Sequence, residues 1–219
     1  MSVVVVAAHP EDELLGPGGT LAAHAQAGED VHAIILTEGA TSRYEPGMAD
    51  VLRRSGWEAA KHIGLSSVSF EGLPDERLDT CPIIEIIQRV GELLKSLDPT
   101  VVYTHFAGDL NADHAVVAQA VWRACGPLSF PRLRRLAAFE TPLSTGASLL
   151  ATPPFVPTLY VDVSSTIEDK LAAMAAYGSE IRPYPHPRSL RSMRERAAVC
   201  GSTIGVAAAE PFVILREQE

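Results

Sequence analysis

The chain has 219 residues, enough to bury one substantial core, and hydrophobic residues make up 47% of it. Acidic residues outnumber basic ones by 27 to 18, and the resulting net charge of −9 argues against a nucleic-acid partner. The three cysteines form no Cys-x-x-Cys pair, so neither a disulfide framework nor a thiolate metal site is indicated. No apolar run approaches the roughly 20 residues of a membrane-spanning helix. We therefore expect a cytoplasmic protein with one domain, residues 1–219.

Strands and helices are predicted to alternate along the chain. The first apolar run, residues 3–8, is typical of a strand buried on both faces of a parallel sheet. After a Gly/Pro-rich turn we expect a helix at 20–27 and a strand at 31–37. The alternation continues with expected helices at 49–63, 83–97, 113–124, 167–177 and 190–200, and expected strands at 67–71, 101–105, 137–140, 159–163 and 212–216. This pattern predicts an α/β, Rossmann-like fold, with a mostly parallel sheet and helices on both faces.

Polar residues gather just after the predicted strands, where the ligand crevice of an open α/β sheet lies. The first cluster is His9-Pro-Glu-Asp-Glu13. An imidazole with neighbouring carboxylates and water suits a catalytic zinc site, because such a site leaves one coordination position open. Taken alone, the same residues also fit a surface turn in which Glu11 or Asp12 caps the next helix.

A second cluster follows the strand at 101–105 and reads His-Phe-Ala-Gly-Asp-Leu-Asn-Ala-Asp-His. It ends at His114, with Asp113 beside it and Asp109 a few residues back. Two separate strand ends could thus supply histidine, carboxylate and histidine to one metal ion. The alternative is that Asp113 caps the following helix and His114 only lies in its first turn.

Together the two clusters resemble the motifs of a known family. Ala8-His-Pro-Glu-Asp-Glu13, followed by Leu-Leu-Gly-Pro-Gly-Gly-Thr20, resembles the Ala-His-Pro-Asp-Asp-Glu and Gly-Gly-Thr signature of the LmbE/PIG-L family of metal-dependent N-acetylglucosamine deacetylases. Residues 109–114 are similar to the second motif of that family. Residues 37–43 resemble its Thr-Asp-Gly and Ser-Arg loop, and residues 177–212 its C-terminal pattern. The resemblance covers essentially the whole chain.

The resemblance implies a metal site and a general base. The metal ligands fall on His9, Asp12 and His114, and the base falls on Glu11, where most members have Asp. Zinc is the expected metal, and Fe²⁺ or another divalent ion would fit the same ligands. The implied reaction is hydrolysis of the N-acetyl amide of an amino sugar, in which the metal acidifies a water and Glu11 accepts its proton.

The resemblance leaves the general acid open. Asn111 stands where several members have a histidine that polarises the carbonyl or protonates the leaving amine. His186, in a Pro-His-Pro-Arg loop, and Asp113, next to His114, are the candidates for this task. Asp109 is expected to orient the ligands and not to bind the metal itself.

Residues around the predicted metal site are the expected substrate contacts. They are Ser42, Arg43, Arg53, Asn111 and Arg188. Ser42 and Arg43 lie on a loop that could bind the hydroxyls or a phosphate of a small amino-sugar substrate, and Arg53 falls where the resemblance implies a substrate-contacting arginine. Family members often form trimers or hexamers, so a homo-oligomer is an open option for this chain.

Three other interpretations stay open. An amidase of the same fold could act on another N-acyl compound, such as a thiol conjugate or an antibiotic intermediate. The glycine-rich turn at 16–19 could belong to a non-catalytic or nucleotide-binding Rossmann-like module, although it is not Gly-x-Gly-x-x-Gly. Glu11 and Asn111 could also mark a family member that has lost catalysis.

Overall fold

The computed structural model describes residues 1–39, 47–147 and 152–219. Its strands are β1 (Ser2–Ala7), β2 (Asp30–Thr37), β3 (Ser67–Leu73), β4 (Val101–His105), β5 (Arg135–Phe139), β6 (Leu159–Asp162) and β7 (Ala209–Glu217). They form one seven-stranded sheet with the order β3-β2-β1-β4-β5-β7-β6. The strands from β3 to β5 in this order pair in parallel, whereas β7 runs antiparallel to both β5 and β6. The predicted α/β fold with a mostly parallel sheet is confirmed.

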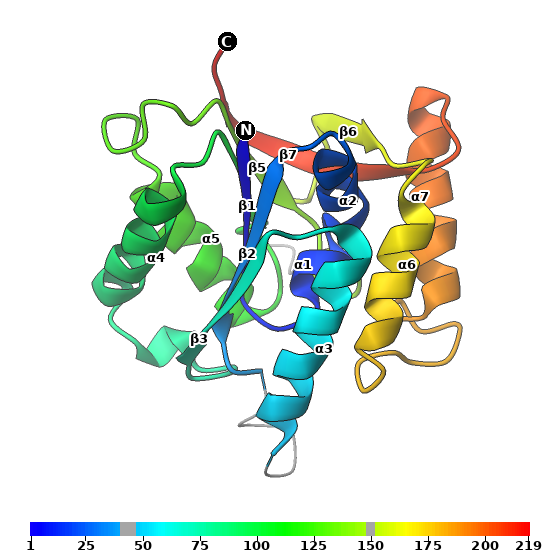
Figure 1. Ribbon diagram of the computed structural model, residues 1–219, viewed down its shortest axis with the longest axis horizontal. Coiled ribbons are helices and arrows are strands. Elements are labelled where there is room, and N and C mark those ends of the chain that lie inside the picture. Colours follow the sequence, from blue (N-terminus) through cyan, green and yellow to red (C-terminus); the bar gives the residue numbers. More distant parts are fainter. Residues whose placement is uncertain (40–46, 148–151) are drawn as a thin grey trace.

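Helices cover both faces of this sheet (Figure 1). They are α1 (Asp12–Leu15), α2 (Gly18–Gln26), α3 (Met48–Ile63), α4 (Ile83–Leu97), α5 (Ala112–Ala124), α6 (Ile167–Ala176) and α7 (Leu190–Ile204). On one face, Val3 and Val5 belong to a buried cluster with residues of α2, α3 and α6. On the other face, Val4 and Val6 belong to a cluster with residues of α4 and α5. Strand β1 is therefore buried on both faces, which explains its unbroken apolar sequence.

The predicted helices and strands are confirmed to within a few residues, and α4 and β4 have the predicted bounds. The prediction missed α1, because its four residues are too few to show a helical period. It also missed the 3₁₀ turns η1 (Leu78–Thr80) and η2 (Thr145–Ala147) for the same reason.

The strand order places the two motifs together. Strands β1 and β4 are neighbours in the middle of the sheet, yet the chain leaves β1 towards β2 on one side and returns to β4 on the other. At such a switch point the loops diverge and open a crevice outside the carboxyl ends of the strands. His9 follows the end of β1, and His105 is the last residue of β4.

A buried ion pair ties the glycine-rich turn of the first motif to the end of the chain. The Glu210 carboxylate, on β7, accepts hydrogen bonds from the backbone N–H groups of Gly19 (2.9 Å) and Thr20 (2.7 Å). The ammonium of Lys170, on α6, lies 2.6 Å from the same carboxylate and also donates to the carbonyl of Gly16 at 3.0 Å. The end of α1 and the start of α2 are thus held by elements that lie much later in the sequence.

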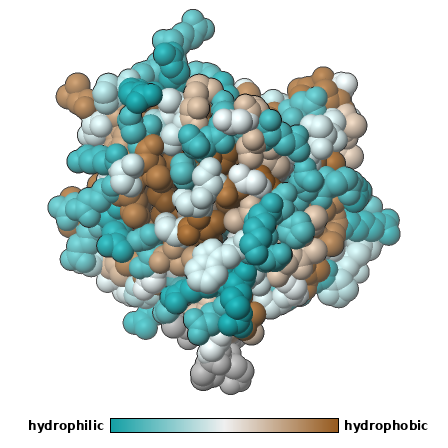
Figure 2. Space-filling model, in the orientation of Figure 1, coloured by the Kyte–Doolittle hydropathy of each residue, from teal (hydrophilic) through white to brown (hydrophobic). Residues whose placement is uncertain are grey.

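The surface facing the viewer in Figure 2 mixes hydrophilic and hydrophobic residues. Across the described ranges, none of the helices combines the length and the apolar character needed to cross a bilayer.

Candidate metal centre

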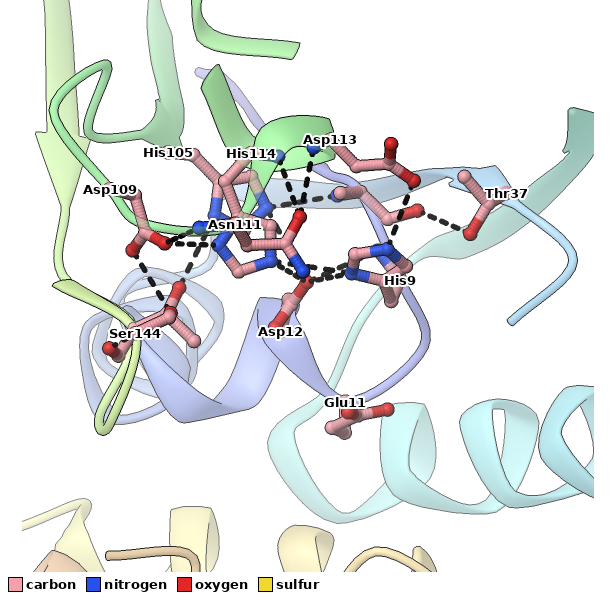
Figure 3. Close-up of polar contacts among 12 residues, drawn as sticks. His9, Glu11, Asp12, Thr37, His105, Asp109, Asn111, Asp113, His114 and Ser144 are labelled. Carbon is pink, nitrogen blue, oxygen red and sulfur yellow. Dashed lines mark hydrogen bonds and ion pairs between the residues drawn. The ribbon is translucent and has the colours of Figure 1, made fainter. Parts of the chain in front are cut away.

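Three buried side chains from the two motifs meet at the switch point (Figure 3), and we call them the metal triad: His9, Asp12 and His114. His9 Nδ1 lies 3.1 Å from Asp12 Oδ2 and 3.3 Å from His114 Nε2. Asp12 Oδ2 lies 3.1 Å from His114 Nε2. A tetrahedral zinc ion with bonds of about 2.0–2.1 Å holds its ligand atoms about 3.3 Å apart. The metal triad therefore has the size of a zinc site.

The electrostatics of the metal triad also fit a cation. Asp12 Oδ1 is buried without a hydrogen-bond partner among the described residues. Burial alone would lower the pKa of His9, but hydrogen bonds to Asp113 and Asp12 raise this pKa to about 10. Burial alone would raise the pKa of the Asp12 carboxyl, but the neighbouring His114 and His9 hold this pKa well below its usual range. Positive charge is thus favoured where the ligand atoms converge, and two imidazoles with one carboxylate leave a fourth position for water.

The first two ligands are placed by a tight turn after β1. The backbone N–H of His9 donates to Asp12 Oδ2 at 3.1 Å. Between them, Glu11 adopts the left-handed backbone conformation with φ of 83°. Gly39 has φ of +71°, and a Cβ there would lie 2.5 Å from Pro10 Cδ. A glycine is therefore required where the loop after β2 crosses the motif.

The third ligand is placed by a helix cap. Asn111 Oδ1 accepts the backbone N–H groups of Asp113 (2.8 Å) and His114 (3.3 Å), so Asn111 is the N-cap of α5. The sequence suggested Asp113 as the cap of this helix, and this suggestion was wrong because the capping residue is Asn111. The amide nitrogen of Asn111 donates to Glu76 at 3.2 Å, and the substrate contact of Asn111 stays a prediction.

Each histidine of the metal triad has a carboxylate on its other ring nitrogen. Asp113 Oδ2 lies 3.2 Å from His9 Nε2, and Asp109 Oδ1 lies 3.2 Å from His114 Nδ1. Carboxylates in this position fix the tautomer and the orientation of metal-binding histidines. Asp113 Oδ1 also accepts the backbone N–H of Leu78 at 2.9 Å. The geometry favours an orienting role for Asp113 as well as for Asp109, and the acid role of Asp113 stays a prediction.

Glu11 is buried and lies apart from the metal triad in Figure 3. Its Oε1 accepts a hydrogen bond from Arg188 Nη1 at 2.9 Å, and the same Nη1 lies 3.2 Å from Glu180 Oε2. Burial raises the pKa of the Glu11 carboxyl, and the Arg188 guanidinium opposes that shift. Arg188, predicted to contact substrate, thus contacts the predicted base.

The other predicted residues have the following positions. Ser42 and Arg43 lie outside the described residues. Arg53 is on α3, with its Nη1 3.7 Å from the carboxylate of Asp50. His186 Nδ1 accepts the backbone N–H of Arg188 at 3.1 Å, so the neutral ring carries its proton on Nε2. The roles predicted for these residues stay predictions.

Two residues to which the sequence assigned no role support the metal triad. The His105 ring stacks on His114 with centroids 3.9 Å apart, and His105 Nε2 accepts the backbone N–H of Ala8 at 2.9 Å. The Thr145 hydroxyl donates to Asp109. The position of His105 at the end of β4 is a signal that could have found it, whereas Thr145 begins the short 3₁₀ turn η2, which no sequence pattern marks.

A cavity of about 520 Å³ has Thr145 in its lining. Apolar residues such as Phe155 line it together with Thr145 and the ion pair between Glu140 and Arg196. Thr145 belongs both to this cavity and to the contacts of Asp109, but no residue of the metal triad is among the described residues of its lining. Thr145 and Asp109 link this cavity to His114, and the cavity is not the metal site itself.

A buried histidine-carboxylate-histidine triad at the switch point of an α/β sheet is the arrangement expected of a metal-dependent enzyme of the α/β class. Residues 4–125, more than half of the chain, match the family model of PIG-L, GlcNAc-PI de-N-acetylase. The chain belongs to this family and is a metal-dependent deacetylase.

Two named deacetylases and one solved structure are similar to this chain. The 1D-myo-inositol 2-acetamido-2-deoxy-alpha-D-glucopyranoside deacetylase of Mycobacteroides abscessus is 27% identical over 82% of this chain and 81% of its own length. The uncharacterized deacetylase YaiS of Escherichia coli is 28% identical over 81% of this chain and 90% of its own length. The crystal structure of the conserved protein TT1542 from Thermus thermophilus is 27% identical and has a TM-score of 0.79, covering 99% of this chain and 96% of that one.

Proposed function

We propose that this protein hydrolyses the N-acetyl amide of a small amino-sugar derivative and releases acetate and a free amine, with residues 1–219 acting as one catalytic domain. The observation that carries the proposal is the metal triad, whose ligand atoms lie 3.1 to 3.3 Å apart. The M. abscessus relative, a deacetylase named for a 2-acetamido-2-deoxyglucopyranoside of inositol, supports an amino sugar as the substrate class.

The chain's own residues have distinct tasks in this proposal. Zinc, or Fe²⁺ in its place, would be held by His9, Asp12 and His114 and would supply an acidified water and a polarised carbonyl. Glu11 accepts the proton of the attacking water, because a carboxylate is an adequate general base in such hydrolases. The amine then leaves with a proton, either returned by Glu11 or given by His186.

The test is a screen for released amine with the zinc-loaded protein. The panel contains N-acetylated amino sugars, free and as glycosides, together with N-acylated thiol conjugates and amino acids. We expect turnover of at least one sugar, and about one zinc ion per chain by elemental analysis. Release from the non-sugar compounds alone would support an amidase of the same fold and contradict the substrate that we propose.

Two variants test the residues. Glu11→Gln keeps the shape of the side chain but removes the base, so we expect metal to be retained and kcat to fall by about 100-fold or more. The His9→Ala/His114→Ala double variant should lose the metal. Glu58→Gln, at an exposed ion pair on α3, is the control and should match the unmodified protein. A fully active Glu11→Gln enzyme would contradict the assignment of the base.

A further inference from the structure

The Glu11 carboxylate is held by a residue 177 positions later in the chain. Arg188 Nη1 lies between two acids, 2.9 Å from Glu11 Oε1 and 3.2 Å from Glu180 Oε2. The side chains of Glu11, Glu180 and Arg188 are only 6%, 4% and 19% exposed. A charged hydrogen bond with so little solvent around it is stronger and more directional than one on the surface.

The segment that carries Arg188 contacts the first motif at a second point. The hydroxyl of Tyr177 donates to Glu13 Oε1 at 2.7 Å. The backbone N–H of Glu180 donates to the carbonyl of Tyr177 at 2.8 Å, which fixes the start of the same segment. Residues 177–188 therefore contact the acids on both sides of the metal ligand Asp12.

The local chain does not fix the direction of the Glu11 carboxylate. The residue has a left-handed backbone with φ of 83°, which a non-glycine residue adopts only when its surroundings hold it there. A glutamate side chain has several rotamers, and burial restricts them only where a partner selects one. Arg188 is that partner, because its planar guanidinium is itself held by the carboxylate of Glu180.

We infer that Arg188 is a positioning residue for the deacetylation, which directs the Glu11 carboxylate, and that Glu180 positions Arg188 in turn. This inference rests on the proposed role of Glu11 as the base, and it differs from the substrate contact that the sequence suggested for Arg188. It also gives a reason for Glu11 where most family members have Asp. A side chain shorter by one methylene would withdraw the carboxylate by about 1.5 Å and lose the contact with Arg188.

A double-mutant cycle between Arg188→Ala and Glu11→Asp tests the inference, with kcat, KM and bound zinc measured for each protein. In the presence of Glu11, we expect Arg188→Ala to lower kcat by about 10- to 100-fold, as expected for a misplaced catalytic group. KM should change less than about twofold, and the zinc content should not change. In the Glu11→Asp background the same substitution should have little further effect, because the contact is already absent.

A rescue experiment and two further variants sharpen the test. Added guanidinium ion should restore part of the kcat of Arg188→Ala, which a purely structural defect would not allow. Arg188→Lys keeps the charge and most of the volume, and is the milder variant if Arg188→Ala does not fold. Its kcat should also fall, because the lysine side chain is one bond shorter and its ammonium would not reach the position from which Nη1 contacts both carboxylates. Arg194→Ala removes an exposed pair with Glu168 on the neighbouring helix and should leave all three quantities unchanged.

The outcomes separate the inference from the proposed function. A raised KM with unchanged kcat in Arg188→Ala would indicate a substrate contact and overturn the inference. Independent effects of the two substitutions would overturn it as well. An active Glu11→Gln enzyme would overturn both the proposed base and the inference, whereas an inactive Glu11→Gln enzyme with full kcat in Arg188→Ala would overturn the inference alone.

Discussion

Individual residues that contact the metal triad determine the orientation of its two imidazole rings. Asp109 uses both carboxylate oxygens for this purpose. Oδ1 lies 3.2 Å from His114 Nδ1 and accepts the backbone N–H of Asn111 at 2.9 Å. Oδ2 accepts hydrogen bonds from the hydroxyls of Ser144 and Thr145. Because Asp109 is itself held by these residues, it can hold the His114 ring in the orientation that a metal requires.

We therefore expect Asp109→Ala to weaken zinc binding by about 10- to 100-fold, since removing such a partner costs affinity of this size. Competition with a chromophoric chelator measures the change. Asp98→Ala, which removes an exposed pair with Arg132, is the control. Equal zinc affinity in the two variants would mean that the contacts of Asp109 do not orient the ligand.

The sequence was most informative where function depends on short spacings. His9 and Asp12 are three residues apart, and the turn between them places both by local geometry. The partner of Glu11 could not be predicted in this way, because 177 residues separate it from Arg188 and only tertiary packing joins them. The sequence pointed to Arg188 as a site residue but not to the group that it contacts.

At the scale of helices and strands, close packing decides which positions accept a side chain. Gly201, in α7, faces the backbone that leads into β7. A Cβ at this position would lie 2.6 Å from Val206 O and 2.8 Å from Ala208 N. Gly91, in α4, has more room, because a Cβ there would lie 4.0 Å from Ala124 Cβ. Close packing therefore requires a glycine at position 201, whereas position 91 has room for a side chain.

Urea unfolding of two matched variants tests this difference. We expect Gly201→Ala to lower the free energy of unfolding by about 1–3 kcal/mol, because backbone atoms do not move aside as side chains do. Gly91→Ala should raise it by about 0.5–1 kcal/mol, through a smaller loss of chain entropy on folding. The same sign of change in both variants would contradict the packing argument.

The elements could be predicted well where a period or a boundary residue marks them. Helix α4 lies between a proline and a left-handed Asp98 and shows a helical period over all 15 residues, so its bounds were predicted correctly. The antiparallel direction of β7 was not predicted, because an apolar run does not encode the direction in which a strand enters a sheet.

For the molecule as a whole, the metal site connects two parts of the fold. Asp12 begins α1, next to β1, whereas His114 lies in the first turn of α5, after β4. A metal ion that binds only the folded chain stabilises it by about 2.7 kcal/mol when its concentration is 100 times Kd. For a protein of this size that corresponds to a rise in Tm of about 5–10 °C.

Removing the metal should therefore lower Tm by about 5–10 °C, measured by scanning calorimetry before and after dialysis against a chelator, with zinc added back to restore it. In the His9→Ala/His114→Ala variant the chelator should have no effect. A drop of the same size in that variant would show that the stabilising ion binds elsewhere.

The contact between Glu210 and the turn before α2 has a consequence for synthesis of the protein. The backbone N–H groups of Gly19 and Thr20 leave the ribosome about 190 residues before the carboxylate that they bind. Lys170, which bridges α1 to that carboxylate, also precedes it in translation. The turn between α1 and α2, which follows Asp12, therefore takes its final form only after β7 has been translated. The motif translated first is thus completed late, and the nascent chain carries the metal ligands before it has the scaffold that holds them in place.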